Sequence, residues 1–131
     1  MKESIDIRVR RSQLGRAKGV GAGGGVHHWW AERVTSIALV PLTIWFIFAM
    51  WQLVGAPYEQ VTGWAKNPIN TALLLALIVM TFHHMHLGLQ VILEDYVDDV
   101  RLRRILVLSV QAAALMLGLL SSVAVIKLAV S

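Results

Sequence analysis

"TFHHMHLGLQVILEDYV", residues 81–97, ends the second of three long apolar stretches and places three histidines inside it. A bilayer core of ~30 Å is crossed by ~20 apolar residues in a helix. The stretches 34–54, 69–93 and 105–130 all reach that length. The sequence therefore predicts an all-α integral membrane protein with three transmembrane helices.

The composition agrees with a membrane protein. Of the 131 residues, 56% are hydrophobic and 15% are charged, whereas about a quarter are charged in soluble domains. We expect one domain, a three-helix membrane anchor over residues 26–131, preceded by a basic, Gly-rich cytoplasmic arm over residues 1–25. The chain has no cysteine, so it cannot itself ligate an iron–sulfur cluster through thiolates.

The positive charges indicate the topology. All of the 12 lysines and arginines except Lys66 and Lys127 precede the first span or lie between the second and third. The positive-inside rule then places the N-terminus and second loop in the cytoplasm. This pattern accounts for the net charge of +4 by membrane insertion, so lipid rather than nucleic acid is the expected partner. Glu3 and Asp6 are unusual in a mitochondrial presequence, which favours the bacterial inner membrane over the mitochondrial one.

The histidines lie within the predicted membrane, where ionisable groups usually have a function. They precede Asp95 by roughly 12–18 Å at ~1.5 Å rise per residue. His84 and His86 point about 200° apart at ~100° per residue, so a regular helix does not direct both to one centre. One ligand from each of two helices is the natural alternative, and haem iron accepts an axial imidazole from each side.

The positions that share a helical face with His84 favour it as the ligand. Gly88 follows four residues later on the same face, where the missing side chain leaves room for a flat macrocycle. Asp95 follows eleven residues later and falls within roughly 20° of that face. For His83 and His86 we favour a neutral imidazole that is hydrogen-bonded to a neighbouring helix.

Two segments resemble a known family. "HMHLGLQVILEDYV" (84–97) and "GVHHWWAERVTSIALVPL" (25–42) are similar to the small haem b anchor subunits, of the cytochrome b556 type, of succinate dehydrogenase, respiratory complex II. The resemblance covers most of residues 24–104. It implies a helix bundle formed with a second cytochrome b anchor subunit, which would supply the other haem ligand.

The resemblance also implies roles for individual residues. His84 matches the axial ligand of the shared haem b. Tyr96 matches the tyrosine whose hydroxyl bonds a ubiquinone carbonyl oxygen, and Asp95 the acid that orients a partner arginine there. Arg33 and His27 match residues near the haem propionates. His86 remains a rival ligand, and the family pattern assigns no role to His28 or His83.

The implied complex contains a flavoprotein subunit and an iron–sulfur subunit, which pass electrons from succinate to ubiquinone. The chain alone would not be an enzyme. Three alternatives remain open: the anchor of a related fumarate reductase, a copper-handling membrane protein that uses the His-His-Met-His cluster of residues 83–86, and a purely structural anchor without a cofactor.

Overall fold

The computed structural model describes residues 24–131. These residues fall in two units with a boundary between Ala31 and Glu32, and each unit is described by itself. The predicted basic arm over residues 1–25 lies almost entirely outside the described residues. In the first unit, residues 24–31 are helical, and the indole rings of Trp29 and Trp30 meet edge to face at 5.2 Å.

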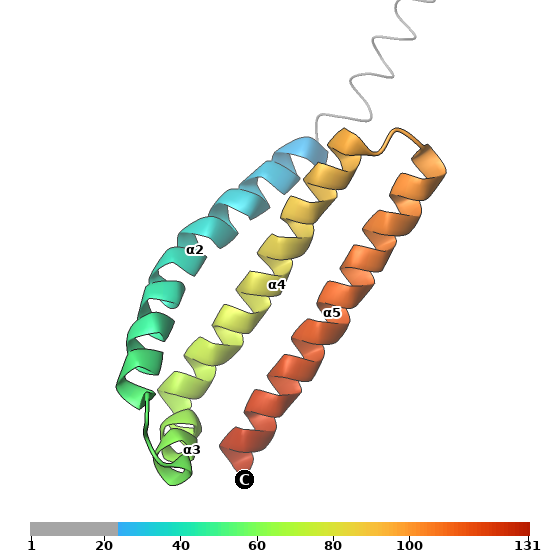
Figure 1. Cartoon of the computed structure of the whole chain (residues 1–131). Helices are drawn as coiled ribbons and strands as arrows, with labels where there is room; N and C mark the ends of the chain where they lie inside the picture. The colour runs from blue at the N-terminus through green and yellow to red at the C-terminus, as the bar shows by residue number, and fades with distance from the viewer. Residues whose placement is uncertain (1–23) are drawn as a thin grey trace, which may run out of the picture. The chain divides into compact units, whose positions relative to one another are not determined.

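The prediction of an all-α membrane protein is confirmed, and the described residues contain no strand. The helices are α2 (Gly24–Leu53), α3 (Tyr58–Lys66), α4 (Pro68–Tyr96) and α5 (Val100–Val130). Of these, α2, α4 and α5 are long and apolar enough to cross a membrane. In Figure 1, α4 runs beside both α2 and α5 and antiparallel to them. The short helix α3 lies between the predicted spans 34–54 and 69–93 and was not predicted.

A corner made by α3 connects α2 to α4. The turn after α2 contains Gly55 at φ 75°, a left-handed conformation that favours glycine. The Trp64 ring of α3 stacks on the Trp45 ring of α2, with centroids 5.8 Å apart. Asn70 and Thr71 of α4 donate hydrogen bonds to the Trp64 and Ala65 carbonyl oxygens, at 2.9 and 2.8 Å. The first turn of α4 thus gives the Ala65 carbonyl a donor and gives the Trp64 carbonyl a second one, beside the Asn67 backbone N–H at 3.3 Å.

The start of α4 is explained by two adjacent residues. Asn followed by Pro is a common start signal for a helix, and Pro68 is the first residue of α4, with Asn67 as its N-cap. The Asn67 side-chain oxygen accepts a hydrogen bond from the Ile69 backbone N–H at 3.0 Å. Proline is tolerated at this position because its missing N–H has no partner in the first turn.

The interface between α4 and α5 holds much of the small core. Leu87 of α4 and Ala114 of α5 are both buried. A Cβ atom at Gly118 would lie 3.5 Å from the Phe82 ring, which is ordinary van der Waals contact, so Gly118 packs beside this ring and an alanine would also fit. Small residues at such positions let helices pack closely in lipid, where the hydrophobic effect gives no driving force for association.

The turn between α4 and α5 is held by polar side chains. Asp99 caps α5 and accepts hydrogen bonds from the backbone N–H groups of Arg101 and Leu102, at 2.8 and 3.1 Å. The Arg103 guanidinium donates to the carbonyl oxygens of Glu94 and Val97, both at 3.4 Å. A cation at the C-terminal end of α4 also offsets the negative end of the helix dipole.

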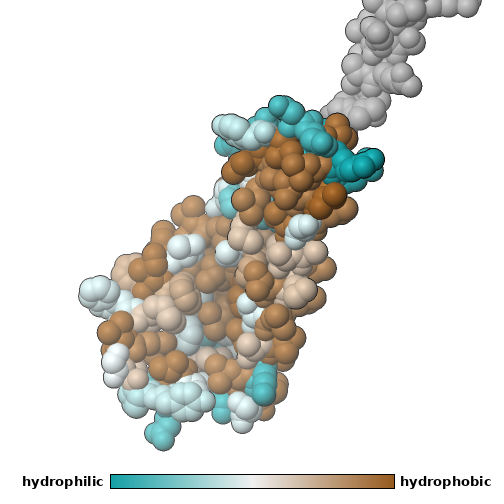
Figure 2. Space-filling model, turned by 45° about the vertical axis from the view of Figure 1, so that its right-hand side comes forward, coloured by the Kyte–Doolittle hydropathy of each residue, from teal (hydrophilic) through white to brown (hydrophobic). Residues whose placement is uncertain are grey.

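The described part of the chain leaves most of its apolar surface uncovered. In Figure 2, hydrophobic residues cover most of the visible face, and hydrophilic residues gather at its two ends. Many large apolar side chains are exposed on all three long helices. Lipid chains or the helices of another protein must cover this surface.

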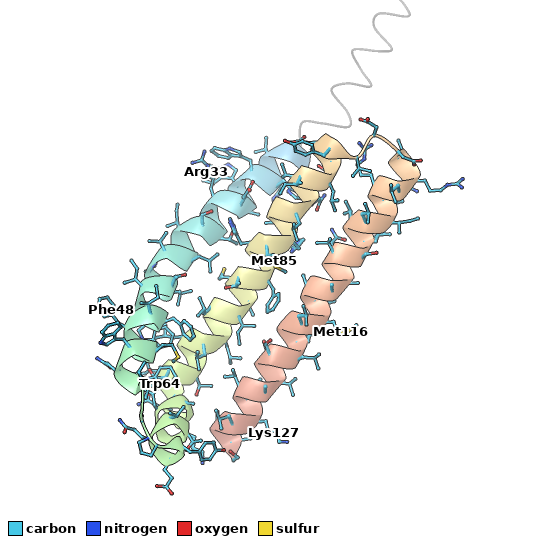
Figure 3. All side chains as sticks on the ribbon, in the orientation of Figure 1. Arg33, Phe48, Trp64, Met85, Met116 and Lys127 are labelled. Atoms are coloured by element: carbon cyan, nitrogen blue, oxygen red, sulfur yellow. The ribbon has the colours of Figure 1, made fainter. Side chains whose placement is uncertain are left out.

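The expected orientation can be tested by labelling, because the natural chain has no cysteine. Lys127 lies near the C-terminal end of α5 (Figure 3), and Arg101 lies at the opposite end of the same helix. In sealed cells, we expect a membrane-impermeant maleimide to label Lys127→Cys but not Arg101→Cys. Arg101→Cys should react only after the membrane is permeabilised. The reverse pattern would show that the N-terminus lies outside.

Candidate functional site

The three histidines of α4 face different neighbours. The His84 ring contacts Thr35 of α2. The rings of His83 and His86 lie together, with centroids 4.9 Å apart, and line a groove shared with α5. The structure therefore separates His84 from the other two histidines, as expected from the angle between His84 and His86.

His84 is held by a direct hydrogen bond between two helices. Its Nδ1 atom lies 3.0 Å from the Thr35 hydroxyl oxygen. The same hydroxyl lies 3.0 Å from the backbone carbonyl oxygen of Glu32, one turn earlier on α2. Thr35 has an exposed fraction of 4% and is the buried polar residue of the described region. The polar partner that an imidazole requires inside hydrocarbon is thus supplied by α2.

The groove on the other side of α4 is mostly apolar. It has a volume of about 240 Å³ and lies between α4 and α5. Its polar lining residues are His83, His86, Gln111 and Ser122. The Gln111 amide donates to the Gln90 side-chain oxygen of α4 at 3.5 Å. The hydrogen bonds expected between the imidazoles of His83 and His86 and a neighbouring helix stay a prediction.

The arrangement of these side chains bears on the copper hypothesis. Among residues 24–131, no group of three or more His, Cys, Asp or Glu side chains is placed to share a metal ion. Met85 lies near the middle of α4 and is exposed (Figure 3). The His-His-Met-His sequence is therefore not gathered around one centre in the described part of the chain.

Gly88 leaves an open space on the face of α4 that also carries His84. A Cβ atom built at Gly88 would meet no atom of the described chain within 4 Å. Packing within this chain therefore does not explain the glycine, in contrast to Gly118, which lies against Phe82. A flat group from outside the chain would find room against the backbone here.

Asp95 and Tyr96 lie at the C-terminal end of α4 and project away from the described chain. Tyr96 is the last residue of the helix, with an exposed fraction of 83%, and Asp95 is also exposed. Within residues 24–131, neither side chain forms a hydrogen bond. Both are therefore available to a ligand or to another subunit. Their neighbour Glu94 accepts a hydrogen bond from Gln90 at 2.8 Å.

The two residues expected near the haem propionates lie on α2. Arg33 is exposed, two residues before Thr35, and Figure 3 places it near one end of the helix. His27 is exposed in the first turns of α2 and belongs to the other unit, so its position relative to His84 is not described. The structure thus brings His84 and the helix that carries Arg33 together.

Thr35 was missed by the sequence analysis. It stands within "AERVTSIALV" (31–40), between the expected propionate-binding Arg33 and an apolar run. A hydroxyl within an apolar span is a weak signal, because Ser and Thr often bond their own helix backbone. Only the packing of α2 against α4 identifies His84 as its partner.

Comparison with known proteins agrees with the resemblance read from the sequence. Residues 8–120 match the model of the succinate dehydrogenase/fumarate reductase transmembrane subunit family. The succinate dehydrogenase hydrophobic membrane anchor subunit of Rickettsia bellii is 32% identical over 102 residues, which cover 77% of this chain and 82% of the relative.

Two further relatives have similar names. The succinate dehydrogenase hydrophobic membrane anchor subunit of Rickettsia conorii is 33% identical over 103 residues and covers 77% of this chain and 82% of its own. The succinate dehydrogenase membrane anchor subunit of Reclinomonas americana is 26% identical over 94 residues, with coverage of 70% and 78%. The chain therefore belongs to the family of succinate dehydrogenase/fumarate reductase transmembrane subunits and is a complex II membrane anchor subunit.

Proposed function

We propose that this chain anchors a succinate dehydrogenase in a bacterial inner membrane, where it helps to bind haem b and forms part of a ubiquinone site. The observation that carries the proposal is the face of α4 that joins His84 to the open space beside Gly88. In a membrane helix, an imidazole can bind the iron of a haem. An open space one turn away on the same face leaves room for the edge of the macrocycle. The names of the relatives favour succinate oxidation over fumarate reduction.

The residues present fit a haem b shared between two subunits. His84 would supply one imidazole, and the rings of His83 and His86 lie together in the groove toward α5 instead. A second imidazole would come from a second cytochrome b anchor subunit, whose helices would also cover part of the exposed apolar surface. Arg33 would pair with a propionate by charge, and the role expected for His27 stays a prediction. When bound, the haem supplies a one-electron carrier inside the membrane.

The chain depends on other subunits for its electrons. It has no cysteine and so provides no thiolates for an iron–sulfur cluster. In a succinate dehydrogenase, an iron–sulfur subunit delivers electrons that a flavoprotein subunit takes from succinate. The anchor would receive them at the end of α4 and direct them to a quinone.

Asp95 and Tyr96 are suited to quinone chemistry at that end of α4. Reduction of a quinone to a quinol takes up two electrons and two protons, and negative charge develops on the carbonyl oxygens. The Tyr96 hydroxyl would donate a hydrogen bond to one of these oxygens and stabilise that charge. The Asp95 carboxylate would orient a cationic side chain of the partner and assist proton delivery.

The location of these two residues explains how protons would arrive. Both are exposed at the end of α4, next to the polar turn that contains Asp98 and Asp99. Water can reach a quinone at this end of α4 without crossing the apolar part of the helices. Asp98 and Asp99 would keep the adjoining surface hydrated.

The ligand assignment is tested with two matched substitutions on the same helix. In the complex purified through a tag on this chain, His84→Leu should abolish the b-type bands of the reduced-minus-oxidised spectrum. His86→Leu should leave them in place, because His86 lies in the groove toward α5. Loss of the bands in His86→Leu alone would make His86 the ligand.

The open space beside Gly88 gives a second, independent test. A Cβ atom at Gly88 would meet no atom of the described chain within 4 Å, so we expect Gly88→Leu to assemble but to bind less haem because the side chain fills the space. Gly63→Leu is the control, since Gly63 is also helical and unobstructed. Haem content is measured per flavin. Full haem content in Gly88→Leu would contradict a macrocycle at this face.

The quinone assignment is tested by removing one hydroxyl. Tyr96→Phe should lower succinate-dependent ubiquinone reduction about 10- to 100-fold, the loss expected when a hydrogen bond to a charged oxygen, of about 1.5–3 kcal/mol, is removed. The haem spectrum and electron transfer from succinate to a soluble dye should stay unchanged. Tyr58→Phe is the control, because Tyr58 is equally exposed but lies in α3, at the start of the other corner. Equal quinone reduction in both variants would remove Tyr96 from the site.

A further inference from the structure

We propose that Thr35 is a positioning residue that holds His84 with a proton on Nδ1 and leaves Nε2 free to bind the haem iron. The inference rests on the proposed function, since it concerns the same ligand. It is carried by two contacts of one buried hydroxyl: 3.0 Å to Nδ1 of His84 and 3.0 Å to the carbonyl oxygen of Glu32. Nothing in the sequence pattern or the family resemblance singled out this residue.

The direction of the hydrogen bond follows from a count of protons. A threonine hydroxyl has one proton to donate and two lone pairs with which to accept. The Glu32 carbonyl oxygen can only accept, so the Thr35 hydroxyl donates its proton to this oxygen. The lone pairs of the hydroxyl oxygen then face Nδ1 of His84, which acts as the donor. In a neutral imidazole with Nδ1 protonated, Nε2 keeps its lone pair and can serve as a metal ligand.

The contact provides what a metal-binding histidine needs. Such histidines donate their second N–H to an acceptor, which fixes the tautomer and the ring orientation and raises the basicity of the ligand. Thr35 is well placed for this task because it is 4% exposed, so water does not compete for Nδ1. The acceptor belongs to α2, and the ligand belongs to α4. The orientation of the ring is therefore set by the packing of two helices.

The same contact explains the choice between His84 and its rival. The His86 ring lies in the groove toward α5, 4.9 Å from the His83 ring. A ring at that position is oriented by another imidazole and by α5. The His84 ring is bonded to Thr35 of α2, the helix that also carries Arg33.

Replacement of the hydroxyl gives a sharp test in the purified complex. Thr35→Val keeps the shape of the side chain and removes the acceptor, and Thr35→Ser keeps the acceptor. Ser36→Ala is the matched control, because the Ser36 hydroxyl also bonds the Glu32 carbonyl, at 2.8 Å, from the next position of α2. The measurements are the haem midpoint potential, obtained by redox titration of the visible bands, and the rate of haem transfer to an excess of apomyoglobin.

We expect Thr35→Val to raise the midpoint potential, because a less basic imidazole stabilises ferric iron less. Haem affinity should fall about 10- to 100-fold, as for other partners of metal ligands. Thr35→Ser and Ser36→Ala should both match the parent complex. If Ser36→Ala shifts the potential as far as Thr35→Val, the effect belongs to the α2 backbone and the inference is overturned.

The remaining outcomes separate this inference from the proposed function. If His84→Leu loses the haem while Thr35→Val keeps the parent potential and affinity, His84 is the ligand but Thr35 does not position it. If His84→Leu retains the haem, the proposed function itself fails. Thr35→Ala is a second variant without the hydroxyl and with a smaller side chain. If neither it nor Thr35→Val assembles whereas Thr35→Ser does, the hydroxyl serves assembly, which also overturns the inference.

Discussion

A polar side chain within hydrocarbon needs a partner, and the hydrogen bond between His84 and Thr35 meets this need at the centre of the candidate site. It joins α2 to α4 through two buried or half-buried groups. Between α4 and α5, Ala114 is buried, and the hydrogen bond from Gln111 to Gln90 is longer, at 3.5 Å. Each of the two helix pairs therefore includes a polar contact, and the shorter one is made by the histidine.

A chain of three long helices can bury only a few of its own side chains. Most apolar side chains of the spans face outward, and so do the residues to which we assign the site: Tyr96 and Asp95 project from the end of α4, and Gly88 opens onto a space that no other part of the described chain fills. This exposure agrees with the proposal that the chain completes its sites together with another subunit.

The sequence predicted those features that depend on local composition. The three spans follow from runs of apolar residues, and the start of α4 follows from Asn67 and Pro68, which act within one turn. The separation of His84 from His86 follows from helical periodicity alone. Each of these predictions required only neighbouring residues.

The features that escaped prediction depend on contacts between distant segments. A helix as short as α3 is marginal by itself; the stacking of Trp64 on Trp45 and the hydrogen bonds from Asn70 and Thr71 stabilise it. The bond from Thr35 spans 49 positions of the chain, and no pattern within α2 indicates which of its faces meets α4. The roles of Asp95 and Tyr96 came from the family resemblance, because an acid and a tyrosine at a helix end are common in any membrane protein.

The hydrogen bonds from the first turn of α4 to the last turn of α3 have a consequence for depth in the bilayer. They make α3 a fixed extension of α4, so the two helices must rise or sink together. Because α3 is short and carries charged and amide side chains, its entry into hydrocarbon is unfavourable, and it limits how far α4 can move into the bilayer. His84 lies sixteen residues after the start of α4, about 24 Å along the helix at ~1.5 Å per residue. The corner at one surface therefore sets the height of the imidazole near the other.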